Sequence, residues 1–330
     1  MKAEYKTKIL TGLRPTNALT VANYLGAVKP ILDLQGDGEK PFVFVADLHA
    51  LTDNEPEVVN RRKEEIVAIY LALGLDPEKN VIYMQSDLKD LVYDLAMILA
   101  RGITVSELLR VPALKDKIRP GVGPETANVL LALYPILMAA DILIQRAEKV
   151  PIGEDQVSHL EVARELARKF NSKYGEVFPL PQPFAVNALK ILSLKGDGKM
   201  SKSKPEWAIL LTDTAKEIEK KIKSAETSFE GEMTPNLESI IKMAKGLTGD
   251  KEAHDKLDSL IIRHMKKEQV MGELKKLISE IACAFNENFQ KKLMKIKSDE
   301  NIVKNVLKDG GKIARERAEE TMSLVYQVFK

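Results

Sequence analysis

An apolar run near the start of the chain constrains the fold most strongly. Residues 41–46 (Pro-Phe-Val-Phe-Val-Ala) include no polar side chain, and Asp47 and His49 follow directly. Such a run is typical of a strand with both faces covered, as in a parallel sheet between two layers of helices. Ligands of these sheets bind beyond the carboxyl ends of the strands, so Asp47 and His49 are expected to face a cleft. The alternative is that both side chains cap the helix that follows.

Neighbouring segments alternate between strand and helix. The patterns predict short strands over residues 8–13 and 80–85, and a helix over 57–73 that Gly74 ends. This β-α-β alternation predicts an α/β fold with a doubly wound, Rossmann-like parallel sheet.

The first strand leads into a possible anion site. A turn is predicted over residues 14–17, followed by a helix for which Thr20 or Asn17 is the expected N-cap. A strand, a tight loop and a helix N-terminus bind anions because the open amide groups and the positive end of the helix dipole face the same side.

Residues 86–150 have a helical pattern, which predicts an insertion between the two halves of the sheet. Helices are predicted over 88–99, 106–109 and 126–144, and Asp141 is the carboxylate of the otherwise apolar last part. An ionised carboxylate in such a place requires hydrogen-bond donors. Asp141 is either the acceptor that senses a ligand's side chain or a structural residue bonded to a backbone amide or an arginine.

The sheet is expected to resume at Val150 and to end with a short strand over residues 191–194. A helix over 158–170 and an extended connector over 178–183 are predicted between them.

A lysine-rich loop, residues 195–205, follows the last predicted strand. Glycines begin it and Pro205 ends it, so its cations lie on neither a helix interior nor a central strand. Such a loop can close on phosphates. The alternative is a solvated linker, since most charged runs mark solvated faces.

Beyond this loop the chain becomes helical in pattern. Residues 206–330 carry apolar side chains at spacings of three and four, for instance Leu274, Leu277, Ile278 and Ile281. The sequence therefore predicts an α/β domain over 1–205 and an all-α domain over 206–330.

Composition limits the partners and the compartment. The 50 Lys and Arg residues nearly balance 48 Asp and Glu, so any contact with nucleic acid must be local. Cys283 is the single cysteine, which excludes an internal disulfide and cysteine-clustered metal sites, and no structural metal is expected. No apolar run approaches the roughly 18 residues of a membrane helix and the first residues lack a signal core. A soluble, cytoplasmic protein is therefore expected.

Five motifs stand in order over most of residues 9–205. They are Thr20-Val21-Ala22-Asn23, the Asp47-x-His49-Ala50-x-Thr52 strand end, Met138-Ala139-Ala140-Asp141, Gly153-Glu154-Asp155-Gln156 and Lys199-Met200-Ser201-Lys202-Ser203. Together they resemble the bacterial-type tryptophanyl-tRNA synthetases, a family of class I aminoacyl-tRNA synthetases. The first motif stands where that family has its HIGH-type tetrapeptide, and the last matches the second class I signature.

The resemblance implies two reactions. Tryptophan and ATP, accompanied by Mg²⁺, give tryptophanyl-adenylate, and the acyl group then moves to the terminal ribose of tRNA(Trp). The resemblance also implies a homodimer formed through the inserted segment 86–150 and anticodon reading by residues 206–330.

The family's functional residues can be carried over where the motifs match. Catalytic roles fall to Thr20, Asn23, Lys199, Lys202 and Ser203. The implied ATP site comprises Arg14, Pro15, Thr16, Ala22, Asn23, Gly153, Glu154, Asp155, Ile191, Lys199, Met200, Ser201, Lys202 and Ser203. The implied tryptophan site comprises Leu10, His49, Tyr134, Met138, Asp141 and Gln156, with Asp141 accepting the indole N–H.

Three positions depart from the usual family pattern, and two other functions stay open. Arg14 stands where Gln is usual, Ala22 replaces a Gly, and Pro112-Ala113 replaces Thr-Gln; these changes bear on ATP affinity and loop closure. A tyrosine enzyme is an alternative because an Asp can also accept a phenol hydroxyl, although the Glu of Gly-Glu-Asp-Gln is usually missing from those enzymes. A paralogue that regulates or binds RNA without aminoacylation is a second alternative, which Ala22 favours and the complete lysine motif disfavours.

Overall fold

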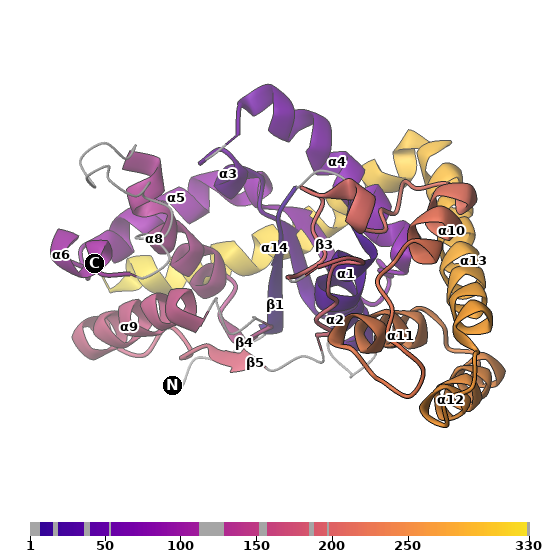
Figure 1. Cartoon of the computed structure of the whole chain (residues 1–330). Coiled ribbons are helices and arrows are strands. Elements are labelled where there is room, and N and C mark those ends of the chain that lie inside the picture. The colour runs from indigo at the N-terminus through magenta and orange to yellow at the C-terminus, as the bar shows by residue number, and fades with distance from the viewer. Residues whose placement is uncertain are drawn as a thin grey trace.

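A five-stranded parallel sheet forms the centre of the molecule (Figure 1). The computed structural model describes residues 7–15, 19–35, 40–52, 54–111, 129–151, 157–184, 188–196 and 198–328. The strands run in the order β3-β2-β1-β4-β5, and every neighbouring pair is parallel. Their bounds are Thr7–Leu13 (β1), Phe42–Val45 (β2), Val81–Met84 (β3), Ala147–Pro151 (β4) and Gln182–Phe184 (β5). The predicted α/β fold with a parallel sheet is confirmed.

Strand β2 shows why the apolar run has no polar residue. Phe42 and Phe44 enter one hydrophobic cluster, whereas Val43 and Val45 enter the other. Alternate side chains of a strand point to opposite faces, so both faces of the sheet are covered.

Helices of the first half pack mainly on the face of the sheet that Val43 and Val45 enter. Gly74 ends α4 with a φ of 114°, a left-handed conformation that favours glycine, as the sequence predicts. The elements are α1 (Val21–Asn23), the π-helical segment η1 (Tyr24–Val28), α2 (Lys29–Asp33), α3 (Asp47–Ala50) and α4 (Pro56–Leu73).

The inserted segment is helical as predicted, within its described part. Its elements are η2 (Gln85–Leu88), α5 (Lys89–Ala100), α6 (Val105–Leu109) and α8 (Val129–Ile144), and α9 (Val157–Tyr174) follows β4. Helix α8 packs on both α5 and α9 and carries Asp141. Pro112 and Ala113 lie outside the described residues.

One predicted strand is wrong, and another begins earlier than predicted. The sheet resumes at Ala147 rather than Val150, and residues 191–194, predicted as a strand, form only an isolated bridge between Leu192 and Lys199. The last strand, β5, instead comes from the end of the predicted connector and includes Pro183. Proline has no N–H to donate, and it is tolerated here because β5 is the edge strand.

The chain after residue 205 is helical, as predicted. A short helix, η5 (Pro205–Trp207), leads to α10 (Ala215–Lys223), α11 (Pro235–Leu247), α12 (Lys251–Met265), α13 (Met271–Lys297) and α14 (Glu300–Gln327). In the part of the chain that the structure describes, no helix is both long and apolar enough to cross a membrane.

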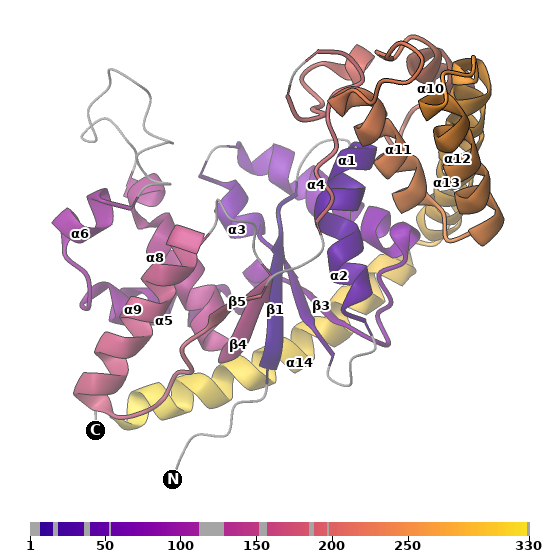
Figure 2. The ribbon, with the colours of Figure 1, turned by 60° about the horizontal axis from the view of Figure 1, so that its bottom comes forward.

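The last helix leaves α10–α13 and runs past the sheet to the inserted segment (Figures 1 and 2). Gly310 of α14 faces the backbone of Ile82 in β3. Further along, Ala314 O accepts a hydrogen bond from Gln145 Nε2 at 3.0 Å, and Arg315 donates to Asp90 in α5. Helix α14 therefore joins the C-terminal helices to the sheet, and the domain boundary at residue 205 stays a prediction.

Replacing Gly310 by alanine is expected to destabilise the protein. A methyl carbon there would lie 1.9 Å from the Ile82 carbonyl oxygen, so helix and strand must separate. Overpacking of this kind costs about 1–3 kcal/mol, which exceeds the roughly 0.5–1 kcal/mol that alanine gains over glycine in a helix. Thermal unfolding measures the difference.

Gly272→Ala in α13 is the matched control, because nothing lies within 4 Å of the added methyl. It should keep or raise the melting temperature. A Gly310→Ala variant as stable as this control would contradict the close approach of α14 to β3.

Candidate functional site

The carboxyl ends of three strands bring polar residues to one edge of the sheet. Strands β1, β2 and β3 are parallel neighbours, so Arg14, Asp47 and Gln85, which follow them, come to that edge. Helix α8 supplies Asp141 from the inserted segment. This is the edge at which parallel sheets bind ligands.

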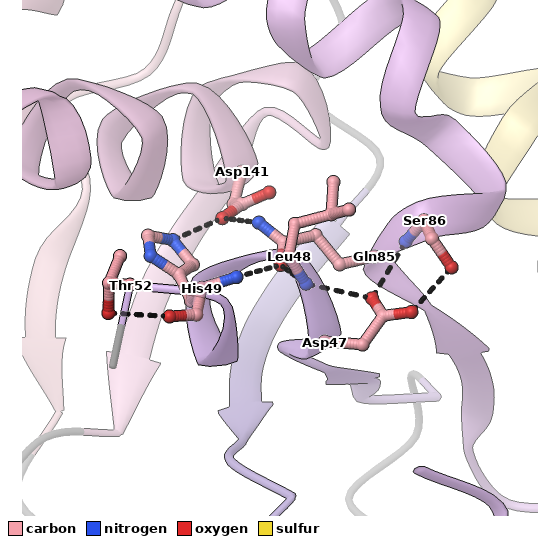
Figure 3. A network of polar contacts seen from close by, with 7 residues as sticks. All are labelled: Asp47, Leu48, His49, Thr52, Gln85, Ser86 and Asp141. Carbon is pink, nitrogen blue, oxygen red and sulfur yellow. Dashed lines mark hydrogen bonds and ion pairs between the residues drawn. The ribbon is translucent and has the colours of Figure 1, made fainter. Parts of the chain in front are cut away.

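Asp141 is buried and has two side-chain partners (Figure 3). Its Oδ2 accepts a hydrogen bond from Gln85 Nε2 at 2.7 Å and lies 2.9 Å from His49 Nε2. Burial raises the pKa of the Asp141 carboxyl, and the contacts with His49 and Gln85 oppose that rise. The partner that the sequence required is thus an amide and an imidazole, rather than a backbone amide or an arginine.

Gln85 fixes the orientation of this group. Its Oε1 accepts hydrogen bonds from the backbone N–H groups of Leu48 and His49, each at 3.1 Å, which leaves its Nε2 to donate to Asp141. Sequence analysis did not single out Gln85. The signal was present, because Gln85 is the polar residue that ends the strand predicted over 80–85.

Asp47 lies beside this group and has a structural role. The carboxylate accepts from the N–H groups of Leu48 and Ser86 and from the Ser86 hydroxyl at 2.5 Å, and the residue is 3% exposed. Figure 3 shows it tying the end of β2 to the segment after β3. Of the two residues predicted to face a cleft, only His49 meets a candidate ligand-binding side chain, Asp141.

Apolar and aromatic side chains complete the surroundings of α8. Tyr134 is buried, and its hydroxyl lies 2.5 Å from His159 Nε2. Leu10 of β1 is fully buried in the same hydrophobic cluster, and Met138 is half-buried against it. An N–H donor on an apolar ring would find its acceptor here in Asp141.

The first motif forms a helix start. Thr20 is the N-cap of α1, and its hydroxyl oxygen accepts from Asn23 N at 3.1 Å, as predicted for a cap. Asn23 Oδ1 in turn accepts from the N–H and the hydroxyl of Thr20. Thr20 is fully buried while Asn23 is exposed, so the cap leaves the Asn23 amide nitrogen as the donor that can face a ligand. Ala22 between them is half-buried.

Backbone hydrogen bonds join this helix start to the segment that follows the lysine loop. Val21 N donates to Ile209 O and Leu211 N donates to Leu19 O, both at 2.9 Å. The first motif is therefore joined to the segment just after the lysine loop, although the two lie far apart in the sequence.

The lysine loop presents its cations to solvent. Met200 is buried in the core, whereas Lys199, Ser201, Lys202 and Ser203 are exposed. No carboxylate in the described ranges pairs with Lys199 or Lys202. These two ammonium groups are therefore available for an anion such as a triphosphate.

The remaining predicted residues fall into two groups. Arg14 is exposed, while Pro15 and Ile191 are buried, so Ile191 supports the loop from the core. Thr16, Gly153, Glu154, Asp155 and Gln156 lie outside the described residues. No group of three or more His, Cys, Asp or Glu side chains that could hold a metal ion occurs within the described ranges.

Gln85→Leu is expected to destabilise the protein, because it removes one of the two partners of the buried Asp141 carboxylate and the side-chain acceptor of the Leu48 and His49 N–H groups. Each unsatisfied buried group costs about 1–3 kcal/mol. Denaturant unfolding measures the loss. The pKa of the Asp141 carboxyl is raised in the folded protein, so its protonation favours the folded state in acid, and this contribution is lost as the pH rises. The hydrogen bond from Gln85 favours the ionised carboxylate. The variant should therefore lose less stability in acid than at neutral pH.

Gln182→Leu on the exposed edge strand is the control, and it should change the free energy of unfolding by only about 0.5 kcal/mol. Equal losses in the two variants would mean that Gln85 does not hold the buried carboxylate.

Comparisons with known proteins show which family the chain is similar to. A model of the family described as tRNA synthetases class I (W and Y) matches residues 1–304. A tryptophan–tRNA ligase of Porphyromonas gingivalis is 38% identical, over 97% of this chain and 98% of its own. A tryptophan–tRNA ligase of Corynebacterium glutamicum is 36% identical, over 99% and 95% of the two chains.

Solved structures of the same family are similar to this chain over nearly its whole length. The tryptophanyl-tRNA synthetase of Campylobacter jejuni, in complex with ADP and tryptophan, superposes with a TM-score of 0.82 at 32% identity, covering 97% of this chain and 99% of its own. The enzyme of Mycoplasma pneumoniae gives a TM-score of 0.81 at 30% identity, with 98% and 97% covered.

Proposed function

The chain belongs to the class I tRNA synthetases of the tryptophan and tyrosine (W and Y) family, and from this premise we propose that it is a tryptophan–tRNA ligase. The observation that carries the choice of amino acid is Asp141, a buried carboxylate oriented by Gln85 and His49 among apolar side chains. An indole offers one N–H and a large apolar surface, which suits that environment.

Tryptophan is proposed to bind between the sheet edge and α8. Asp141 accepts the indole N–H, while Leu10, Tyr134 and Met138 shape the apolar walls. His49 holds the carboxylate in place. Gln156 is proposed to bind the ammonium group of the amino acid.

ATP is proposed to bind at the helix start of α1, under the lysine loop. Asn23 donates to the phosphates from the first turn, where the helix dipole favours an anion, and Thr20 acts by holding Asn23. Lys199 and Lys202 bind the phosphates from above, with the Ser201 and Ser203 hydroxyls beside them. The rest of the nucleotide meets Arg14, Pro15, Thr16, Ala22, Gly153, Glu154 and Asp155, while Ile191 and Met200 support the loop.

The first step requires alignment and charge stabilisation rather than a protein nucleophile. A carboxylate oxygen of tryptophan attacks the α-phosphorus of ATP, which enters as its Mg²⁺ complex, and pyrophosphate leaves with the electron pair of the broken P–O bond. Negative charge grows on the leaving phosphates as the bond breaks. Lys199 and Lys202 stabilise that charge, which is how phosphoryl transfers are largely catalysed.

In the second step a hydroxyl of the terminal ribose of tRNA(Trp) attacks the tryptophanyl carbonyl, and AMP leaves. The C-terminal helices are proposed to bind the anticodon. Helix α13 offers exposed Lys291, Lys292 and Lys295 as a local basic surface on a chain of nearly balanced charge. Since tRNA and ATP meet there, we place the enzyme in the cytoplasm.

Asp141→Asn should lower kcat/KM for tryptophan at least about tenfold, because a hydrogen bond to a charged acceptor contributes roughly 1.5–3 kcal/mol. The KM for ATP should change little. Tryptophan-dependent exchange of pyrophosphate into ATP is the assay, with tyrosine as the competing substrate. An undiminished kcat/KM would make Asp141 a structural residue, and exchange that depends on tyrosine would overturn the choice of amino acid.

Lys202→Ala should slow adenylate formation with little effect on tryptophan affinity, since this ammonium acts chiefly on charge that develops in the transition state. Single-turnover measurement of tryptophanyl-adenylate formation separates rate from affinity. Lys204→Ala is the control, because Lys204 lies over the Trp207 ring at 4.4 Å rather than among the predicted phosphate ligands. A Lys202 effect confined to the KM for tryptophan would contradict this role.

A homodimer through the inserted segment is also proposed. Helices α5, α6 and α8 expose large apolar side chains, which are Tyr93, Met97, Val105, Val129, Leu130 and Leu133. An apolar surface spread over neighbouring helices favours association, and a symmetric pair is the commonest form of soluble oligomer.

Met97→Asp should shift the protein toward monomer, because it places a charge in the proposed interface. Sedimentation velocity at micromolar concentration measures the state. Met294→Asp in α13 is the matched control, since Met97 is 66% exposed and Met294 is 68% exposed. A wild-type monomer, or equal effects of the two variants, would contradict this interface.

A further inference from the structure

The lysine loop forms a turn whose two sides bond to each other. Ser193 N donates to Gly198 O and Met200 N donates to Ile191 O, both at 3.0 Å. The far side of the turn, residues 198–203, carries the exposed Lys199 and Lys202. The position of their two ammonium groups therefore depends on what holds the near side of the turn, residues 192–196.

Helix α11 holds that near side with two buried polar side chains. Asn236 is 7% exposed, and its Nδ2 donates to Ser193 O and to Gly196 O, both at 3.1 Å. Ser239 lies one turn further along the helix, and its Oγ accepts from Leu192 N at 2.7 Å. All three contacts are to backbone groups, so they fix the path of the loop whatever its side chains do.

A second set of bonds supports the same segment. Glu226 N donates to Leu194 O, and Glu226 Oε2 accepts from Gly196 N, both at 2.8 Å. Leu194 N donates to Trp207 O at 2.9 Å. Asn236 is nevertheless the only side chain among these that bridges two carbonyls of the turn.

The other end of α11 rests on the helix that continues the first motif. A methyl carbon added to Gly246 would lie 2.9 Å from Leu25 Cδ2 and 3.0 Å from Leu189 Cδ1. Leu25 belongs to η1, which directly follows α1. Helix α11 thus contacts both the lysine loop and η1, the segment that directly follows Asn23.

We propose that Asn236, assisted by Ser239, is a positioning residue for adenylate formation. It holds the near side of the turn so that Lys199 and Lys202 stand at a fixed place relative to Asn23, and it touches no reacting atom itself. This role rests on the proposed tryptophan activation. It places a determinant of the ATP chemistry on a helix of the C-terminal region, outside the motifs that the sequence singled out.

Asn236→Asp is the informative variant, because it keeps the shape and replaces the donor by an oxygen that faces two carbonyl oxygens. The single-turnover rate of adenylate formation should fall about tenfold or more, with the affinity for tryptophan unchanged. Ser239→Ala, a milder change at the same segment, should lower the rate in the same way and serves if Asn236→Asp fails to fold.

Asn286→Asp is the matched control. Asn286 is also a buried asparagine whose Nδ2 donates to a backbone carbonyl, that of Asp213, at 2.6 Å, but it does not contact the lysine loop. It should lower the melting temperature as Asn236→Asp does and leave the rate of adenylate formation unchanged.

A double-mutant cycle with Lys202→Ala separates positioning from general destabilisation. If Asn236 acts through the lysine loop, Asn236→Asp should lower the rate by a smaller factor once Lys202 is absent, because only the effect through Lys199 is left. An equal loss in both backgrounds, or a rate loss matched by Asn286→Asp, would overturn the proposal. Absence of tryptophan-dependent activity in the wild type would instead overturn the proposed function.

Discussion

The hydrogen bond from Gln85 to the buried carboxylate of Asp141 is the interaction on which the site depends. An unpaired carboxylate at 3% exposure would favour protonation, because burial raises its pKa. Gln85 and His49 offset that effect and leave one oxygen, Oδ1, outside their hydrogen bonds. The same contacts connect α8 to the ends of β2 and β3. The proposed amino-acid pocket therefore depends on how α8 and the ends of β2 and β3 are placed relative to one another.

The parallel sheet fixes the relative positions of these elements, and the C-terminal region stabilises the sheet. Helix α14 lies against β3, where Gly310 allows close approach, and it contacts the inserted segment through Ala314 and Arg315. Helix α11 meets the lysine loop and η1. The C-terminal helices thus contact both the elements that carry the proposed tryptophan site and the elements that carry the proposed ATP site. Stability and chemistry share the same contacts, so variants at these positions require a measurement of folding beside a measurement of rate.

The sequence predicted the elements whose pattern is local. The unbroken apolar run gave β2, Gly74 gave the end of α4, and Thr20 gave the cap of α1. The need of Asp141 for a partner was also predictable, because it is one carboxylate in an apolar helix. The partner was not, since Gln85 lies 56 positions away and meets Asp141 only through the packing of α8 on the sheet.

Other features could not be read from pattern because they depend on what the chain meets in space. Residues 182–184 and 191–194 are both short and extended in pattern, and only the first finds an open sheet edge beside β4. Residues 191–194 bond instead to α11 and to their own loop. Helix α14 has the same apolar spacing as its neighbours, and only Gly310 marks its contact with a strand. Asn236 carries no motif, and its importance follows from the two carbonyls that it reaches.

The central claim, that Asp141 recognises the indole N–H, can be tested by removing that N–H from the ligand. The measurement compares kcat/KM in pyrophosphate exchange for tryptophan and for its benzothiophene analogue, in which sulfur replaces the N–H, in the wild type and in Asp141→Asn. The wild type should prefer tryptophan by at least about tenfold, since a buried acceptor left unpaired is costly, and the variant should lose most of this preference. Equal preference in the two proteins would contradict the account.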